Sequence, residues 1–168
     1  MYILRELNKG DLVRINEWRN DSDLISNLGA PYRFISIDVD NEWYENYLKK
    51  RSTTVRCAIV EKDNPNLILG LVSLTDIDFI NRSAELHIMI GDKNYRDKGV
   101  GTFAVNSIVK HAFDNLNLRR IELEVLEDNV IAIHLYEKCG FEKEGLKRDA
   151  IFKNNRYMSV LIMSKLKE

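Results

Sequence analysis

The chain has 168 residues, which fits one domain, and its 45% hydrophobic and 30% charged residues are ordinary for a globular protein. The 25 basic and 26 acidic side chains leave a net charge of −1, so the composition gives no general attraction to nucleic acid. A nucleic-acid-binding function is therefore disfavoured.

The cysteines and the apolar runs also limit the class of protein. Cys57 and Cys139 have no zinc-binding spacing, and no apolar run reaches the ~18–20 residues that cross a bilayer. The sequence does not decide whether the two thiols form a disulfide, but isolated thiols without a signal peptide are more typical of a reduced protein. We therefore expect a cytoplasmic protein without a metal site and without a membrane partner.

The first third of the chain predicts one short strand followed by three helical segments. Asp11 is placed to cap a helix, because Leu12, Ile15 and Trp18 recur after it at helical spacing. The expected ranges are 2–5 for the strand and 11–20, 24–28 and 40–50 for the helices.

After residue 50 the apolar period changes from helical to alternating. In the segment 84–91 the alternation places Glu85, His87 and Met89 on one face of a strand and apolar side chains on the other. The expected strands are 55–61, 67–75, 84–91, 120–126, 141–152 and 156–165, and the expected helices are 99–116 and 130–138. We see no repeat or linker, so one mixed α/β domain over residues 1–168 fits.

The segment Asn94–Thr102, NYRDKGVGT, lies between the third of these strands and a long helix. A helix N-terminus leaves backbone N–H groups unpaired and carries partial positive charge, which favours anions. Gly99 and Gly101 let a phosphate approach the backbone, while Arg96 and Lys98 add cationic donors. The segment is neither a Walker A loop nor a dinucleotide-binding turn. On these residues alone, a phosphate cradle and a solvated helix-capping turn are equally compatible.

A second motif follows on the next predicted helix. The first segment matches (Q/R)-x-x-G-x-(G/A) at Arg96, Gly99 and Gly101. The second matches N-x-x-A-x-x-L-Y-x-x-x-G-F at Asn129, Ala132, Leu135, Tyr136, Gly140 and Phe141. Together, in this order and strand–helix context, they resemble the motifs of the GCN5-related N-acetyltransferase (GNAT) family. The chain is most similar to the branch that holds spermidine, ribosomal-protein and nucleotide-amino-sugar N-acetyltransferases.

The resemblance implies an α/β (α+β) GNAT fold, with a mixed and mostly antiparallel sheet of about seven strands and helices on both faces. It also implies acetyl-CoA as cosubstrate, no metal, and transfer of the acetyl group to a primary amine by direct attack on the thioester. The implied cofactor-binding residues are Met89, Ile90, Gly91, Arg96, Asp97, Lys98, Gly99, Val100, Gly101, Thr102, Asn129 and Tyr136. The first three would pair through their backbone with an extended cofactor arm inserted beside a splayed strand.

Tyr136 is implied to be the general acid. The leaving thiolate has a conjugate-acid pKa of about 8.5, and a phenol of pKa about 10 can donate a proton to it. The alternative interpretation is an aromatic packing residue. An amine of lysine-like pKa must also lose a proton at a cost of about 4–5 kcal/mol at pH 7. Glu85 and His87 are candidate bases, each of which has a surface or structural role as its alternative.

The acceptor is expected between the N-terminal helices and the final hairpin, with Arg19, Tyr32 and Arg33 as substrate-binding residues. Arginines there suit an anionic amine such as an amino-sugar nucleotide; a protein N-terminus is a further candidate. Spermidine is an alternative, although the segment 27–32 lacks the carboxylates that polyamine enzymes of this branch carry there. A non-catalytic CoA-binding module also stays open, as does the choice between a monomer and a homodimer.

Overall fold

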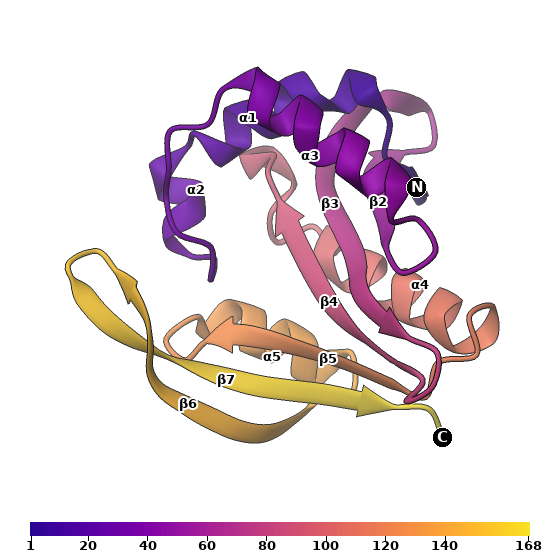
Figure 1. Cartoon of the computed structure of the whole chain (residues 1–168), viewed down its shortest axis with the longest axis vertical. Helices are drawn as coiled ribbons and strands as arrows, with labels where there is room; N and C mark the ends of the chain where they lie inside the picture. Colours follow the sequence, from indigo (N-terminus) through magenta and orange to yellow (C-terminus); the bar gives the residue numbers. More distant parts are fainter.

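Seven strands and five α-helices follow one another along residues 1–168, all of which the computed structural model describes (Figure 1). The strands are β1 (Tyr2–Glu6), β2 (Val55–Glu61), β3 (Asn64–Asp78), β4 (Ser83–Ile90), β5 (Arg120–Leu126), β6 (Glu142–Lys153) and β7 (Arg156–Leu166). The helices are α1 (Leu12–Arg19), α2 (Ser22–Ser26), α3 (Ile37–Lys49), α4 (Val100–Asp114) and α5 (Val130–Lys138), with 3-10 turns η1 (Lys9–Asp11) and η2 (Lys93–Tyr95). Every strand and helix that the apolar pattern predicts is present.

The strands form one sheet in the order β1-β2-β3-β4-β5-β7-β6. Neighbouring strands are antiparallel except β4 and β5, which run parallel. A parallel pair needs a long crossover connection, and α4 lies in the connection between these two strands. The expected fold, a mixed and mostly antiparallel sheet with helices on both faces, is confirmed.

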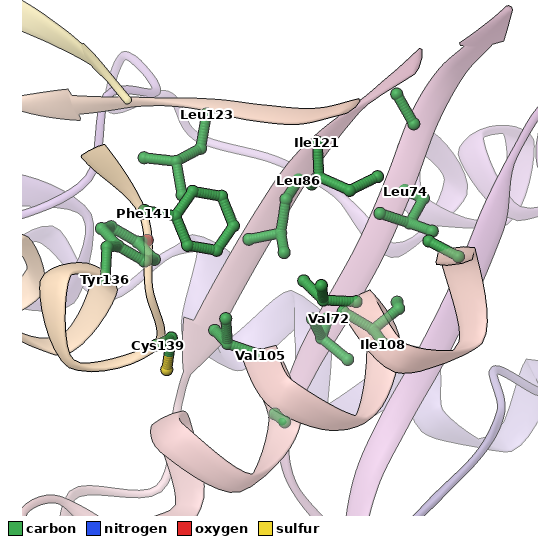
Figure 2. Close-up of a cluster of buried hydrophobic side chains, with 14 of the residues drawn as sticks. Val72, Leu74, Leu86, Val105, Ile108, Ile121, Leu123, Tyr136, Cys139 and Phe141 are labelled. Carbon is green, nitrogen blue, oxygen red and sulfur yellow. The ribbon is translucent and has the colours of Figure 1, made fainter. Parts of the chain in front are cut away.

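Two apolar clusters attach the helices to opposite faces of the sheet. The larger one has 23 buried residues and joins α4 and α5 to the strands through side chains such as Ile108, Leu86 and Leu123 (Figure 2). The smaller one has nine buried residues and joins α1, α2 and α3 to β2 and β3. No residue of β5, β6 or β7 belongs to the smaller cluster, so this half of the sheet carries no helical layer on that second face (Figure 1).

Several element boundaries differ from the expected ones: α2 spans Ser22–Ser26 rather than residues 24–28, β3 ends at Asp78 rather than at residue 75, and the starts of α3 and β3 differ as well. Helix α3 begins at Ile37 rather than at residue 40, after an extended Ser36. Ile37 and Val39 are exposed, so they add nothing to the apolar period from which the start was predicted. Strand β3 begins at Asn64 rather than at residue 67, because Asn64 already pairs with the last residue of β2 and so includes Pro65 in the strand.

Asp11 occupies the N-cap position of α1, as expected, but its side chain makes no capping hydrogen bond to that helix and belongs instead to the capping box of η1. Its carboxylate accepts hydrogen bonds from Arg5 at 2.7 and 2.8 Å and from the backbone N–H of Asn8 at 2.9 Å. It therefore anchors β1 to the turn before α1. Cys57 and Cys139 are both free thiols. None of the helices is at once long and apolar enough to cross a lipid bilayer.

Candidate functional site

Strands β4 and β5 stay together over three residue pairs and then diverge (Figure 1). The pairs join Ser83–Glu85 to Arg120–Glu122, so the rest of β4 has no partner strand on that side. The diverging ends of the two strands lead into α4 and α5. The divergence that the family resemblance implied is therefore present, and the gap offers a strand edge to an extended ligand.

The gap exposes the backbone groups of alternate residues of β4. Gly91 donates its N–H to the carbonyl of Leu69 in β3 at 3.0 Å, so Gly91 faces β3. Backbone groups alternate in direction along a strand, so Met89 also faces β3 while Ile88 and Ile90 face the gap. Of the three expected backbone partners, Ile90 is the one directed into the gap. Ile88 also faces the gap and was not among the expected partners, although the alternation along the strand could have indicated it.

The loop between β4 and α4 has the geometry of an anion cradle. Arg96, Asp97 and Lys98 are exposed, and Gly99 precedes the helix with a φ of 78°. A Cβ at Gly99 would meet no atom within 4 Å. Phe103 donates the first intrahelical bond, to the carbonyl of Gly99 at 2.9 Å, so the earlier N–H groups of α4 have no helical partner. Open space, free N–H groups and the positive end of the helix dipole fit a pyrophosphate.

Gly101 is explained by helix packing as well as by the cradle. A Cβ at Gly101 would lie 2.5 Å from Cδ1 of Leu135, so the glycine lets α4 and α5 approach each other. Val100 is 1% exposed and its side chain lies in the core, while Thr102 is half-buried. At residues 100 and 101 only the backbone can reach a phosphate. The sequence could not separate the two roles, because a packing glycine and a phosphate-binding glycine look alike in a motif.

Asn129 caps α5 and also contacts a distant segment. Its Oδ1 accepts the backbone N–H of Ala132 at 3.2 Å, and its Nδ2 donates to the carbonyl of Asn27 at 3.0 Å. Both ends of the amide thus have protein partners. One N–H of the Asn129 side chain remains to bind a ligand.

Tyr136 lies in the larger apolar cluster and is 7% exposed, with its ring 5.9 Å from that of Phe141 (Figure 2). Burial raises the pKa of Tyr136 to about 12, so the hydroxyl stays protonated at neutral pH. No protein group bonds to this hydroxyl, and the only fully enclosed side-chain polar atom without a partner is Nε of Arg56. The Tyr136 hydroxyl therefore reaches the molecular surface. The side chain packs in the core, and its hydroxyl is also free to donate a proton.

Glu85 and His87 lie on the opposite face of β4 from the cluster that contains Tyr136. Nε2 of His87 is 3.0 Å from the hydroxyl of Thr75 and 3.7 Å from the carboxylate of Glu85. The side chains of Glu85 and His87 are 34% and 52% exposed, so water reaches both. The candidate acid and the candidate bases therefore flank the gap from opposite faces of the sheet.

A profile described as "Acetyltransferase (GNAT) domain" matches residues 2–142. The chain belongs to the GNAT family. The spermidine N(1)-acetyltransferase of Vibrio cholerae is 37% identical over 158 residues, which cover 94% of this chain and 88% of that protein. The structure of V. cholerae spermidine N-acetyltransferase with CoA and spermine has a TM-score of 0.91 at 33% identity, covering 98% of this chain and 95% of that one. A dodecameric structure of V. cholerae spermidine N-acetyltransferase in an intermediate state has a TM-score of 0.83 at 32% identity, covering 98% and 93% of the two chains.

This GNAT protein is accordingly an N-acetyltransferase that uses acetyl-CoA, as the resemblance in the sequence implied. The cosubstrate supplies an acetyl group as a thioester. The free N–H groups and open space at the start of α4 fit its pyrophosphate. The unpaired edge of β4 fits its extended arm.

A cavity of about 330 Å³ lies in this GNAT domain where β4 and β5 begin to diverge, on the face without a helical layer. Its charged lining consists of four carboxylates and two cations, which gives a net charge of −2. The lining residues are Glu85, Arg120, Glu122, Leu123, Glu124, Glu144, Lys147 and Ile162. Sequence reasoning missed this cavity because its charged side chains come from three strands. The indication was that Glu122 and Glu124 alternate with buried residues in β5.

The cations in the cavity pair with three of its carboxylates. Arg120 contacts Glu122 at 2.9 Å and Glu144 at 2.6 Å, and this contact lowers the pKa of Glu144 to about 2. Lys147 pairs with Glu124, which raises the pKa of Lys147. Glu85 has no lysine or arginine partner. It is therefore the carboxylate of the cavity whose charge is least compensated.

The structure does not bring the expected substrate-binding residues into one site. Arg19 forms an ion pair with the fully buried Asp40 and stacks 5.6 Å from the ring of Trp43, so its charge is already compensated. The Tyr32 hydroxyl donates to a backbone carbonyl at 3.2 Å, and Arg33 is exposed. Of the two arginines, only Arg33 has a guanidinium without a carboxylate partner.

A third arginine, which the sequence did not single out, lies on the same face as His87. Arg56 of β2 stacks 4.6 Å from the ring of Trp43 and donates from Nη1 to the hydroxyl of Ser73 at 3.3 Å. Its enclosed Nε has no partner, and burial lowers its pKa. Arg56 pairs through β2 with Ser73, and Ser73 pairs with His87. Arg56, Ser73 and His87 therefore lie side by side on three neighbouring strands. They join a guanidinium without a carboxylate partner to a candidate base.

Proposed function

We propose that this GNAT enzyme acetylates a small polycationic amine of the spermidine type, which binds with an ammonium group at the cavity beside Glu85. One observation carries the proposal: an incompletely neutralised group of carboxylates lines the open face of the sheet where β4 and β5 diverge. An ammonium ion there gains Coulomb energy in a partly enclosed site. The named spermidine N-acetyltransferases among the relatives support the same acceptor class. Segment 27–32 lacks carboxylates, and the cavity provides the missing negative charge elsewhere.

We propose that Glu85 accepts the amine proton through a water molecule, with His87 as its hydrogen-bonding neighbour. Glu85 lines the cavity, whereas His87 does not. The amine nitrogen then forms a bond to the thioester carbon and loses its second proton to solvent, and the carbon–sulfur bond breaks. Tyr136 donates its proton to the departing sulfur from the other face of the sheet and regains one from solvent. The phenol is protonated at neutral pH, so a proton is available for this step, although burial makes it a weaker acid than an exposed tyrosine.

The remaining cofactor contacts are proposals of the same kind. Residues 96–102 would hold the pyrophosphate through backbone N–H groups and the side chains of Arg96 and Lys98. Ile88 and Ile90 would pair with the extended arm, and Asn129 would add the one N–H that remains free on its amide. Each assignment follows from unpaired backbone or side-chain donors around the gap.

A second acceptor class is favoured by Arg56. A partly buried guanidinium without a carboxylate partner is costly, and an anionic group on the acceptor would compensate it. An amine that carries an acid group, such as an amino-sugar nucleotide, would place its amine near Glu85 and its anion near Arg56. The relatives named above support the first class rather than this one.

Release of free CoA from acetyl-CoA tests both classes. We expect spermidine and spermine to give the highest kcat/KM in a panel that also holds amino acids, amino-sugar nucleotides and N-terminal peptides. Glu85→Gln should lower kcat/KM for spermidine at least tenfold, whereas Glu142→Gln, an exposed control on β6 outside the cavity, should not. Higher salt should also raise KM for spermidine. If only an amine with an acid group is turned over, the acceptor belongs to the second class and not to the first. If no amine releases CoA, the chain is a CoA-binding module without acetyltransferase activity.

We also propose that the chain self-associates. A relative of 32% identity has been solved as a dodecamer. Strand β6 forms one edge of the sheet and most of its residues are exposed, which leaves unpaired backbone groups along that edge. Sedimentation velocity would distinguish a monomer, a homodimer and a larger assembly.

A further inference from the structure

Helix α2 lies between the two halves of the molecule, at the side toward which β4 and β5 diverge (Figure 1). Its N-terminal end is tied to the β4 side. Asp21 caps α2 by accepting the N–H groups of residues 23 and 24, and it pairs with Lys93 of η2 at 3.1 Å. The turn η2 directly follows β4.

The C-terminal end of α2 is tied to the other half. Lys153 at the end of β6 donates its ammonium to the carbonyl of Ile25 at 2.5 Å and to the carbonyl of Leu28. Asn129 at the start of α5 donates to the carbonyl of Asn27. Helix α2 therefore spans the open end of the gap, with polar contacts to both diverging sides.

Of the residues that make these contacts, Lys153 has the most unusual surroundings for a charged side chain. It is 7% exposed, it contacts no carboxylate, and burial lowers its pKa. Its charge is met only by two backbone carbonyl groups, that of Ile25 in α2 and that of Leu28 just after the helix. A helix of five residues has little stability of its own, so the position of α2 depends on its tertiary contacts.

We propose that Lys153 is a positioning residue for the acceptor. It fixes α2 and the following segment 27–36, which has no regular secondary structure, over the open end of the gap. This segment and the β6–β7 hairpin then form two walls at the open end of the acceptor site, whose inner end is the cavity beside Glu85, and Lys153 sets the separation of these walls. The proposal rests on the proposed function for the location of the acceptor, but the hydrogen bonds themselves can be tested without any acceptor.

The test compares Lys153→Met with Lys167→Met. Lys167 donates a hydrogen bond from its ammonium group to the carbonyl of Phe113 at 2.7 Å, near the C-terminal end of α4. This is the same kind of lysine–carbonyl contact, but it lies away from the gap. Hydrogen exchange of the acceptor-free protein should show faster exchange of the amides of residues 24–34 in Lys153→Met and parental exchange there in Lys167→Met.

With spermidine as acceptor, Lys153→Met should raise KM for spermidine about tenfold and leave KM for acetyl-CoA within twofold. Lys153→Arg, which keeps the charge and the donors, should recover part of this loss. If Lys153→Met does not fold, Lys93→Met releases the other end of α2 from an exposed pair and should raise KM for spermidine in the same direction. The proposal would be overturned if Lys153→Met and Lys93→Met kept the parental hydrogen exchange and the parental KM for spermidine. It would also be overturned if Lys167→Met changed these two quantities as much as Lys153→Met does. If no amine is turned over, the proposed function fails, while the exchange experiment still decides whether Lys153 holds α2.

Discussion

Tyr136→Phe is expected to separate catalysis from stability. The ring packs 5.9 Å from Phe141, and this contact survives the substitution. No protein group bonds to the hydroxyl, so its removal breaks no hydrogen bond, and the free energy of unfolding should change by less than about 1 kcal/mol. Loss of a general acid is typically worth about 10²–10⁴-fold in rate, or about 2.7–5.4 kcal/mol of activation free energy.

A buried tyrosine in α3 offers a matched control. Tyr47 is 5% exposed, close to the 7% of Tyr136, but its hydroxyl donates to Glu6 at 2.7 Å. Tyr47→Phe should therefore cost about 1.5–3 kcal/mol of stability, the usual value for a hydrogen bond to a charged group, and leave kcat unchanged. The two variants should thus show opposite patterns in denaturant unfolding and in turnover.

Single-turnover rates with saturating acetyl-CoA are the appropriate measurement, because slow product release would hide part of a chemical effect. The dissociation constant of acetyl-CoA should be unchanged, since the hydroxyl acts on charge that develops at sulfur only during the reaction. A Tyr136→Phe protein with the parental single-turnover rate would refute the reasoning. Tyr136 would then be a packing residue, and the thiolate would take its proton from water.

Two further predictions follow from glycine geometry and from an ion pair. Gly101→Val, whose larger branched side chain overpacks Leu135, should destabilise the fold by about 1–3 kcal/mol, whereas Gly99→Ala should cost about 1–2 kcal/mol through its positive φ alone. Denaturant unfolding measures both, and a Gly101→Val protein of parental stability would contradict the α4–α5 packing. The pKa of Glu144 is lowered to about 2 from 4.5, so its pairing with Arg120 stabilises the fold above pH 4.5 and this stabilisation is lost as the pH falls toward 2. Because the Glu144 side chain is 39% exposed, screening limits the effect to about 1 kcal/mol. Arg120→Met should remove most of it from the pH dependence of unfolding, while the hydrogen bond from Ser164 to Glu144 keeps the rest. An Arg120→Met protein that keeps the parental acid dependence would exclude this pair as its source.

The sequence predicted the order of the elements because each has a clear apolar period, as in β5, where Ile121, Leu123 and Val125 alternate with glutamates. It did not predict the start of α3, because the apolar residues in the first turn of that helix are exposed and do not belong to its buried apolar face. Local patterns also indicated the loop before α4, since a glycine with positive φ before a helix is a property of neighbouring residues.

The parts of the site that the sequence did not predict come from contacts between distant residues. Lys153 binds a carbonyl 128 positions away, and the carboxylates of the cavity come from β4, β5 and β6. Arg19 looked available for a substrate because its partner Asp40 lies on another helix. In each case the partners of the side chain depend on how separate elements pack together. The apolar period of a single helix or strand carries no information about that packing.

The positions of the proposed acid, the proposed base and the two thiols support our proposal that the amine attacks the thioester directly, without a covalent acetyl-enzyme. An acyl carrier would need a thiolate near the gap. Burial raises the pKa of Cys57 to about 11, and Cys57 lies on β2, with β3 and β4 between it and the gap. Cys139 is 4% exposed and burial raises its pKa as well. In the proposed mechanism, Glu85 on the open face takes the proton of an incoming amine and Tyr136 protonates the sulfur from the core side, so one direct transfer needs no acetylated protein residue.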